Sequence, residues 1–362
     1  MINPWQGEIF PPPSLGYLQA AIKTMAGVTV TARDLDAAMA DNATYDIVAV
    51  SFHSFSVQHA RRIREKFKGR LVCGGHHVSA LPEQLLNIGY DQVVIGEGEN
   101  AIKDIINGDT NSIINGPPVD VETTPPPDYT GFGGDWSIGL PVISSRGCPF
   151  DCTFCASALF WHRKWRMRSA ANVLDEIYHL PTKRFMFEDD NFTNNRQRVA
   201  DICHGLEGRG YTWQCASRAE TLQDADMCMQ LRRAGCHTVW LGVESLSQAS
   251  LDRNHKSTTV ARMLSGINTA DANGLQTFSQ FIVGLPDDTQ QDVDETVRNI
   301  RRSRIGRRGC NTLWVLPNTA VHKRAKTFGF NDEIYLQSGA PFYTFEQSAA
   351  TLQQWTNQIN TA

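Results

Sequence analysis

Residues 140–155, LPVISSRGCPFDCTFC, join an apolar run to a loop that contains three cysteines. The alternation of apolar runs with amphipathic stretches continues from there to about residue 320. The later runs are RFMFED at 184–189, TWQCAS at 212–217, TVWLGVE at 238–244, TFSQFIVG at 277–284 and TLWVLP at 312–317. Six strand and helix repeats predict a partial or closed (β/α)6 barrel of parallel strands that resembles a TIM barrel, whose chemistry belongs at the carboxyl ends of the strands.

Residues 1–112 carry a shorter alternation, with apolar runs at 28–34, 47–52, 70–75 and 92–99. This pattern predicts a doubly wound parallel sheet of the Rossmann or flavodoxin kind. In such sheets ligands bind beyond the carboxyl ends of the strands. Residues 113–139 are rich in proline and glycine and indicate a linker. The predicted domains are therefore a sheet domain at 1–112, a linker at 113–139, a barrel at 140–325 and a C-terminal cap at 326–362.

Composition limits the possible functions. The chain has 362 residues, is 41% hydrophobic and carries a net charge of −4, which suits two folded domains and argues against binding a polyanion through the overall field. No apolar run approaches the roughly 18 residues that span a bilayer, and the N-terminus lacks the pattern of a signal peptide. An odd count of nine cysteines suggests a reducing compartment, so we expect a cytoplasmic protein without a membrane segment.

Cys148, Cys152 and Cys155 are the only cysteines that are clustered in the sequence. Three thiolates at this spacing can bind three irons of a 4Fe-4S cluster, which leaves the fourth iron open. Three cysteines with a histidine such as His162 can instead form a structural zinc site. The spacing alone does not decide between cluster, zinc and chance.

The segment GCPFDCTFC after an apolar strand resembles the cluster loop of radical S-adenosylmethionine enzymes, and the resemblance extends over almost the whole chain. It implies that Cys148, Cys152 and Cys155 bind iron and that Phe154 lies near the adenine. In that family the open iron is chelated by S-adenosylmethionine, and an electron from the cluster cleaves the sulfonium to give a 5′-deoxyadenosyl radical.

The resemblance also implies roles for residues at the ends of the second and third strands. Asp189 or Asp190 would accept hydrogen bonds from the methionyl ammonium group. Ser217 and Arg218 end the third strand, and Arg218 would pair with the carboxylate. A helix N-cap supplied by Asp190 or Asn191 is an equally good explanation of this strand end, and a surface salt bridge is an equally good use of Arg218.

The fourth and fifth strands end in further candidates. The resemblance implies that Glu244 accepts from the ribose hydroxyls. A carboxylate that finishes a strongly apolar strand also needs a partner. Val283 and Gly284 resemble the segment that contacts adenine, where a glycine lets the ligand approach the backbone. A plain turn glycine is the alternative.

Five fragments of the first domain resemble, in order, the cobalamin-binding class of this family. The implied cobalamin positions are Asn3, Ser51, Ser54, Gly74, Gly75, His76, Gly96 and Glu97. The chain lacks the DxHxxG motif that supplies an axial histidine. Bound cobalamin should therefore have no histidine ligand from that motif, and a domain that serves packing alone is the alternative.

These features predict a radical S-adenosylmethionine enzyme with a 4Fe-4S cluster and cobalamin that methylates an unactivated carbon. The alternatives are a cobalamin-independent rearrangement or oxidation, and a non-catalytic metal-binding protein. The expected partners are a small-molecule or peptide substrate and an external electron donor of the flavodoxin or ferredoxin type. The sequence does not specify the substrate or a catalytic residue. Nucleic acid is not expected, because the arginines between Arg298 and Arg308 suit a solvated helix face and loop.

Overall fold

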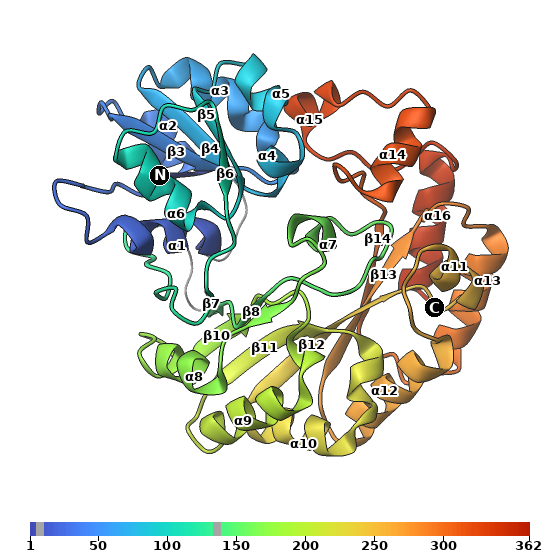
Figure 1. The fold of residues 1–362 in the computed structure, drawn as a ribbon. Helices are drawn as coiled ribbons and strands as arrows, with labels where there is room; N and C mark the ends of the chain where they lie inside the picture. Colours follow the sequence, from blue (N-terminus) through green and yellow to red (C-terminus); the bar gives the residue numbers. More distant parts are fainter. Residues whose placement is uncertain (5–10, 133–138) are drawn as a thin grey trace. The chain divides into compact units, whose positions relative to one another are not determined.

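The computed structural model describes residues 1–4, 11–132 and 139–362, and the chain divides into two compact units (Figure 1). The first unit contains Met1–Ile138, Leu316–Asn318 and Phe330–Pro341. The second contains Gly139–Val315, Thr319–Gly329 and Phe342–Ala362. Among the described residues, no helix is both long enough and apolar enough to cross a membrane.

The first unit is built on a six-stranded parallel sheet with the order β2-β1-β3-β4-β5-β6. Its strands are β1 (Ile2–Asn3), β2 (Arg33–Asp34), β3 (Ile47–Ser51), β4 (Arg70–Gly74), β5 (Gln92–Gly96) and β6 (Ile113–Gly116). The helices between them are α1 (Pro13–Ile22), α2 (Leu35–Ala40), η1 (Val57–His59), α3 (Ala60–Lys66), α4 (His76–Ala80), α5 (Pro82–Asn87) and α6 (Gly98–Ile106). Strand β2 pairs with one side of β1, and β3 pairs with the other side, from where β4, β5 and β6 follow in order. The predicted doubly wound parallel sheet is therefore confirmed.

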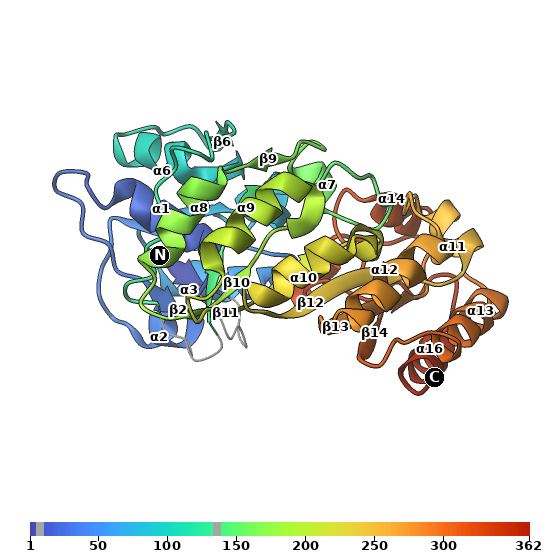
Figure 2. The ribbon, with the colours of Figure 1, turned by 90° about the horizontal axis from the view of Figure 1, so that it is seen from below.

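The second unit has six parallel strands in the order β14-β13-β12-β11-β10-β7. Its strands are β7 (Leu140–Val142), β10 (Arg184–Phe187), β11 (Thr212–Ser217), β12 (Cys236–Glu244), β13 (Thr277–Val283) and β14 (Arg308–Thr312). The main helices are α8 (Ala170–Tyr178), α9 (Arg196–Leu206), α10 (Ala225–Arg233), α11 (Gln248–Arg253), α12 (Val260–Ala272), α13 (Gln290–Arg301), α14 (Ala320–Thr327) and α16 (Ala349–Asn360). Helices α8, α9, α10 and α12 lie along one face of the sheet in both views (Figures 1 and 2). The predicted partial barrel is confirmed.

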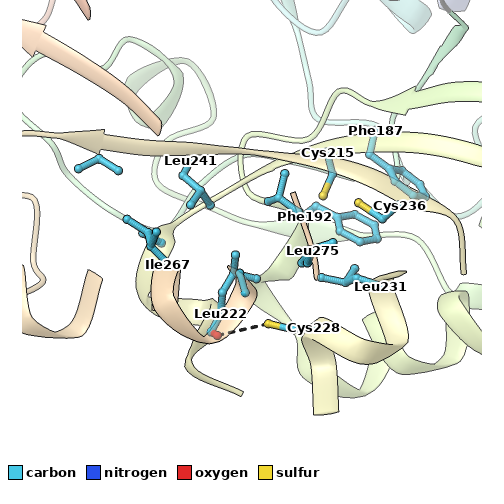
Figure 3. Packing of buried hydrophobic residues seen from close by; sticks show 14 of the residues in the cluster. Phe187, Phe192, Cys215, Leu222, Cys228, Leu231, Cys236, Leu241, Ile267 and Leu275 are labelled. Carbon is cyan, nitrogen blue, oxygen red and sulfur yellow. Dashed lines mark hydrogen bonds between the residues drawn. The ribbon is translucent and has the colours of Figure 1, made fainter. Parts of the chain in front are cut away.

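Apolar side chains from the strands and from these helices form the core of the second unit (Figure 3). The Phe187 and Phe192 rings stack with centroids 4.2 Å apart, and Trp213 is fully buried beside them. The six cysteines outside the cysteine loop are all buried, and burial raises the pKa of Cys228 to about 11. These scattered cysteines therefore pack the cores of the two units, and only the trio remains a candidate site.

The last strand lies earlier than the sequence predicts. The apolar run at 312–317 was the expected strand, whereas β14 covers Arg308–Thr312. The Leu313 N–H still donates to the Val283 carbonyl of β13 at 2.9 Å, whereas the Leu313 carbonyl accepts from the Tyr343 N–H at 2.7 Å. Strand β14 begins with the charged Arg308, so the sequence does not show it as part of an apolar run. In the structure the Arg308 guanidinium donates to the Ile359 carbonyl at 2.8 Å.

The division of the chain also differs from the predicted boundaries. The stretch expected to be a linker begins with β6, whose residues pair with β5. The region expected to be a single cap is shared between the two units, because α15 (Glu333–Ser338) belongs to the first unit. Tyr335 of α15 is fully buried, with its ring 5.2 Å from that of His77. These contacts join residues far apart in the sequence, so local patterning does not reveal them.

Candidate active site

The cysteine loop begins at a glycine that no other residue can replace without a clash. After β7, the short strand β8 (Ser145–Arg146) pairs with β9 (Arg166–Met167), and Gly147 follows β8. Gly147 has a φ of 96°, and a Cβ at this position would lie 2.0 Å from the Lys164 carbonyl oxygen. The chain can therefore turn into the cysteine loop only because residue 147 has no side chain.

The three candidate iron ligands are half-buried. Burial raises the pKa of Cys155 to about 11, although the backbone N–H groups of Ala158 and Ser157 donate to its sulfur. The Phe150 N–H likewise donates to Cys148. Backbone donors around sulfur fit a cluster site, because such hydrogen bonds stabilise thiolate ligands and tune an iron–sulfur cluster.

Within the described ranges, no three histidine, cysteine, aspartate or glutamate side chains converge on one point where a metal ion could bind. A 4Fe-4S cluster does not require such convergence, because each thiolate binds a different iron. His162, the histidine considered for a zinc site, is solvent-exposed just after α7 (Ser157–Phe160).

Two distant segments hold the middle of the cysteine loop. The Thr153 N–H donates to the Asn254 carbonyl at 3.2 Å, and the Thr153 hydroxyl donates to Asn254 Oδ1 at 2.8 Å. The Thr153 carbonyl accepts from the Ala320 N–H at 3.1 Å, at the start of α14. Asn254 is buried, so the loop is fixed between α11 and α14 at a residue that sequence analysis did not select.

Asp189, one of the two candidate acceptors for the methionyl ammonium group, is fully occupied by the fold. Its carboxylate accepts from the Ser144 N–H at 2.7 Å and from the Ser145 N–H at 3.0 Å. It also accepts from both serine hydroxyls at 2.6 Å. Asp189 therefore fixes the chain that leads from β7 into the cysteine loop.

Buried arginines surround the same two serines. Arg198 of α9 donates to the Ser144 carbonyl at 2.7 Å and to the Arg168 carbonyl at 3.0 Å. Its Nη2 lies 3.8 Å from Asp189 Oδ2, and Arg168 in turn pairs with the buried Glu176. Burial lowers the pKa of Arg198. These charges compensate one another beneath the loop, and Arg198 Nη1 is buried without a hydrogen-bond partner among the described residues.

Asp190, the other candidate, is solvent-exposed and accepts a hydrogen bond from the Ser157 hydroxyl. Partial desolvation by the surrounding protein raises its pKa, and its charge contributes to the raised pKa of Cys148 and of Cys155. Of the two adjacent aspartates, Asp190 is thus the one next to the cysteines with a carboxylate that can reach a ligand. It does not cap a helix, because the next α-helix, α9, is capped by Asn195.

The third strand ends in residues that support the fold. The Ser217 hydroxyl lies 2.9 Å from that of Thr221 and also contacts Thr193. The buried Arg218 pairs with Glu220 and donates to the Lys256 carbonyl, and its guanidinium lies 3.8 Å from the centroid of the Phe150 ring. Arg218 is therefore placed under the cysteine loop, and a direct contact with a carboxylate stays a prediction.

At the end of β12 the structure provides the partner that a strand-end carboxylate needs. Glu244 has a left-handed φ of 66° at an irregularity of the β12–β13 register, and its Oε1 lies 3.0 Å from the Lys256 ammonium group. Lys256 is buried, and both groups lie against Gly242. Sequence analysis missed Lys256, because the only available signal was that Glu244 needs a cation.

The conformation of the chain explains the glycine at the end of the fifth strand. Gly284 has a φ of 78°, and a Cβ there would lie 2.6 Å from Leu352 Cδ2 of α16. The turn conformation and the helix contact therefore require a glycine without any ligand. Val283 is buried, whereas Phe154 in the cysteine loop is half-buried. The adenine contacts stay predictions.

At the carboxyl edge of the first unit, glycines keep the strand ends close to their neighbours. Gly75 has a φ of 103°, and a Cβ there would lie 2.7 Å from the Phe52 carbonyl oxygen. Gly96 has a φ of 92° and lies against the Gly116 carbonyl. Gly74 differs, because a Cβ at this position would make only ordinary contacts with Val94, the nearest at 3.5 Å. A substitution of Gly74 can therefore test whether a ligand contacts this strand end without disturbing the fold.

Several side chains predicted to line cobalamin take part in internal hydrogen bonds. Ser54 Oγ lies 3.0 Å from His77 Nδ1, and Ser51 Oγ lies 3.2 Å from Ser14 Oγ. The buried Glu97 accepts from the Val119 N–H at 2.9 Å. These bonds shape the edge of the sheet and leave little polar capacity for a ligand.

His76 and Asn3 lie half-buried at the same edge. Burial and the neighbouring His53 lower the pKa of His76 to about 3, so its ring is neutral at physiological pH. His76 and His53 have ring centroids 5.6 Å apart. Whether cobalamin contacts these residues stays a prediction.

Comparisons with known protein families agree with this division. A model described as Radical SAM superfamily matches residues 142–300, and a model described as B12 binding domain matches residues 8–106. The chain therefore contains a radical S-adenosylmethionine domain and, before it in the sequence, a B12-binding domain.

Curated relatives extend the same similarity. The chain is 32% identical over 261 residues to Uncharacterized methyltransferase PH0819 of Pyrococcus horikoshii, with 63% of this chain and 57% of the relative aligned. It is 30% identical over 270 residues to the anaerobic magnesium-protoporphyrin IX monomethyl ester cyclase of Rubrivivax gelatinosus, with 64% and 48% aligned. The chain thus spans about half the length of these relatives.

Among solved structures, the fold is similar to that of the radical S-adenosylmethionine methyltransferase TsrM from Kitasatospora setae, described with cobalamin and a [4Fe-4S] cluster bound. The TM-score is 0.72 at 17% identity, and the alignment covers 90% of this chain and 74% of TsrM. A second TsrM structure, with tryptophan substrate and a SAM analogue bound, has a TM-score of 0.74 at 16% identity and covers 89% and 75%. At these identities the comparison supports the fold alone.

Proposed function

We propose that this protein is a cobalamin-dependent radical S-adenosylmethionine enzyme that methylates a carbon of a small-molecule or peptide substrate. The observation that carries the proposal is the loop with Cys148, Cys152 and Cys155 directly after the first strand of a parallel six-stranded barrel. In such barrels the chemistry takes place at the carboxyl ends of the strands. The matches to two family models, one for each unit, support the same assignment.

The three cysteines would bind three irons of a 4Fe-4S cluster, and their backbone N–H donors would stabilise the thiolates. Asp189 holds the chain that enters the loop, and Asn254 holds the middle of the loop. Asp190 would accept from the ammonium group of S-adenosylmethionine. When bound, the cluster and cobalamin supply reductive cleavage of S-adenosylmethionine and a carrier for the methyl group.

Glu244 and Lys256 would form the ribose side of the site. Lys256 occupies Oε1 of Glu244 at 3.0 Å, which fixes the rotamer and leaves Oε2 to accept from a ribose hydroxyl. A carboxylate oxygen accepts a stronger hydrogen bond from a hydroxyl than a neutral oxygen does. Arg218 would act as a positioning residue through its contact with Phe150.

The first unit would hold cobalamin at its carboxyl edge. Gly74 at the end of β4 would leave the backbone accessible to a flat macrocycle. Polar side chains at this edge hydrogen-bond to one another, so binding would depend on shape and backbone contacts more than on a single strong ligand.

A second candidate function is ring formation or oxidation without net methylation. The observation that favours it is the 30% identity to a curated cyclase, close to the 32% identity to a curated methyltransferase. Both candidates use the same cluster loop, so they are distinguished only by the product.

The first test is the metal content of anaerobically reconstituted protein. We expect about four irons per chain and reductive cleavage of S-adenosylmethionine to 5′-deoxyadenosine. The variants Cys148→Ala, Cys152→Ala and Cys155→Ala should lose the cluster and this activity while keeping the fold. Cys228→Ala, at a buried core thiol, is the matched control that should keep both. Stoichiometric zinc without iron would contradict the enzyme assignment.

The second test is cobalamin retention. Protein loaded with hydroxocobalamin should keep it through gel filtration, and the Co(II) form should lack nitrogen superhyperfine splitting from an axial histidine. Product analysis with candidate substrates then separates methylation from ring closure. Protein that cleaves S-adenosylmethionine but retains no cobalamin would support the cobalamin-independent alternative.

A further inference from the structure

We propose that the loop beyond the cysteines is the docking surface for a small acidic protein that delivers single electrons. The inference rests on the proposed function, in which each cleavage of S-adenosylmethionine consumes one electron. The carrier loses that electron to the cluster, which passes it to the sulfonium; the C5′–S bond breaks, and methionine leaves. We call the exposed side chains of this loop the cluster-side surface: Leu159, His162, Arg163, Lys164 and Met167.

The cluster-side surface is in contact with the residue that precedes the first cysteine. A Cβ on Gly147 would lie 2.0 Å from the Lys164 carbonyl oxygen and 3.0 Å from Trp161 Cβ. The pairing of β8 with β9 joins the far end of the loop to the same segment. Electron transfer requires the partner to approach the cluster, and this loop is an exposed segment that touches the cluster loop directly.

The backbone of the loop presents its cations to solvent. His162 and Arg163 both adopt left-handed conformations, with φ of 54° and 56°. The Arg163 N–H donates to the Ala158 carbonyl at 2.7 Å, and the Lys164 N–H donates to the Trp161 carbonyl at 3.0 Å. This tight turn fixes the backbone from which the consecutive basic side chains extend, which reduces the backbone entropy lost when a partner binds.

The charge of the loop is opposite to that of the whole chain. Residues 157–168, SALFWHRKWRMR, contain four arginine or lysine residues and no aspartate or glutamate, whereas the chain carries −4. In the part of the chain that the structure describes, neither Arg163 nor Lys164 forms an ion pair. Unneutralised cations on one face steer an anionic partner and accelerate its association.

Apolar side chains lie next to these cations. Leu159 is 37% exposed and Met167 is 44% exposed, both unusually accessible for large hydrophobic residues. An apolar centre with a charged rim is the usual composition of a protein–protein interface, and weak electron-transfer complexes use small interfaces of this kind. The combination of exposed apolar side chains and cations fits a transient acidic protein partner.

A second basic region serves as a comparison. Arg301 and Arg302 end α13, which runs back from the carboxyl ends of the strands, so they lie at the opposite end of the barrel from the cysteine loop. They are exposed and equally cationic. The two regions therefore have similar charge, and they differ in that only the cluster-side surface lies beside the cysteines.

The experiment measures anaerobic reduction of the reconstituted cluster by stopped-flow absorbance, with either a reduced acidic flavodoxin or dithionite as the donor. The test variant is Arg163→Glu/Lys164→Glu, and the matched control is Arg301→Glu/Arg302→Glu, with the same change in charge. We expect the second-order rate constant with flavodoxin to fall by about tenfold or more in the test variant at low salt. Reduction by dithionite should change much less, because this small anion responds to the local charge but needs no docking surface.

Salt and a milder variant provide further checks. Added salt should slow the wild-type reaction with flavodoxin and should have little effect on the test variant. Arg163→Gln/Lys164→Gln should give an intermediate rate. Equal losses in the test and control variants, or no loss in the test variant, would overturn the proposal. A wild-type protein without a dithionite-reducible cluster would instead contradict the proposed function.

Discussion

The carboxyl edges of the two parallel sheets use their polar residues differently. In the second unit, one aspartate of an adjacent pair supports the fold and the other is exposed beside the cysteines. In the first unit, Ser54 and Glu97 both form internal hydrogen bonds. The first edge thus offers mainly backbone, whereas the second offers charged and sulfur-bearing side chains. An edge of the second kind suits a charged ligand and iron, and an edge of the first kind suits a large flat ligand that is held by shape.

The largest expected effect is that of Gly147→Ala. The added methyl would lie 2.0 Å from the Lys164 carbonyl oxygen, on a left-handed backbone. Iron incorporation and S-adenosylmethionine cleavage should fall by more than about a hundredfold, because the cysteine loop must be displaced. Gly208→Ala is the control, with a φ of 73° and no neighbour within 4 Å. Normal iron content in Gly147→Ala would show that the loop is not fixed by this contact.

The two adjacent aspartates should separate stability from binding. Asp189→Ala leaves buried serine donors and Arg198 without their acceptor, so the free energy of unfolding should fall by about 3–5 kcal/mol. Asp190→Asn should leave stability nearly unchanged and weaken S-adenosylmethionine binding by roughly tenfold. Urea denaturation and equilibrium binding measure the two effects. A loss of stability in Asp190→Asn together with a loss of binding alone in Asp189→Ala would contradict these roles.

A buried carboxyl beyond β13 makes the stability of the second unit depend on pH. Burial raises the pKa of Asp288 to about 7, well above the usual range of an aspartate, while the Ser250 hydroxyl donates to it at 2.6 Å. The folded state therefore holds a proton that the unfolded state loses near pH 4. This stabilising contribution is complete below pH 4 and is lost as the pH rises through 7.

Asp288→Asn should remove this pH dependence. Between pH 4 and pH 8 the free energy of unfolding of the wild type should fall by about 2–4 kcal/mol more than that of the variant. Urea denaturation at several pH values measures the difference. Asp201→Asn, at an exposed position of α9, controls for the loss of one charge. Parallel curves for wild type and Asp288→Asn would show that Asp288 titrates normally.

The smallest effect concerns the edge of the first unit. Gly74→Ala should fold normally, because its Cβ would make only ordinary contacts, and it should weaken cobalamin retention by about tenfold if the macrocycle lies against this backbone. Gly75→Ala should destabilise the sheet domain itself, because of the Phe52 carbonyl and the φ of 103°. Cobalamin titration and thermal unfolding distinguish the two variants. Unchanged cobalamin affinity in Gly74→Ala would place the cofactor elsewhere on this edge.

Local patterns were sufficient for the architecture and for the cysteine loop. Strand and helix periodicity, together with the spacing of Cys148, Cys152 and Cys155, depends on residues that are close in the sequence, so it predicts two parallel sheets and a three-thiol loop. The exception is β14, because its charged first residue and the apolar run after it shift the pattern by several residues.

The tertiary structure alone decided which polar residues are available to a ligand. Asp189 and Asp190 are adjacent in the sequence, yet only packing against Ser144 and Ser145 distinguishes them. Asn254 and Lys256 lie in a short polar loop without periodicity, about a hundred residues from the cysteine loop that Asn254 holds. A hydrogen-bond partner is set by the three-dimensional packing of helices and strands, and single-sequence patterns do not contain that information.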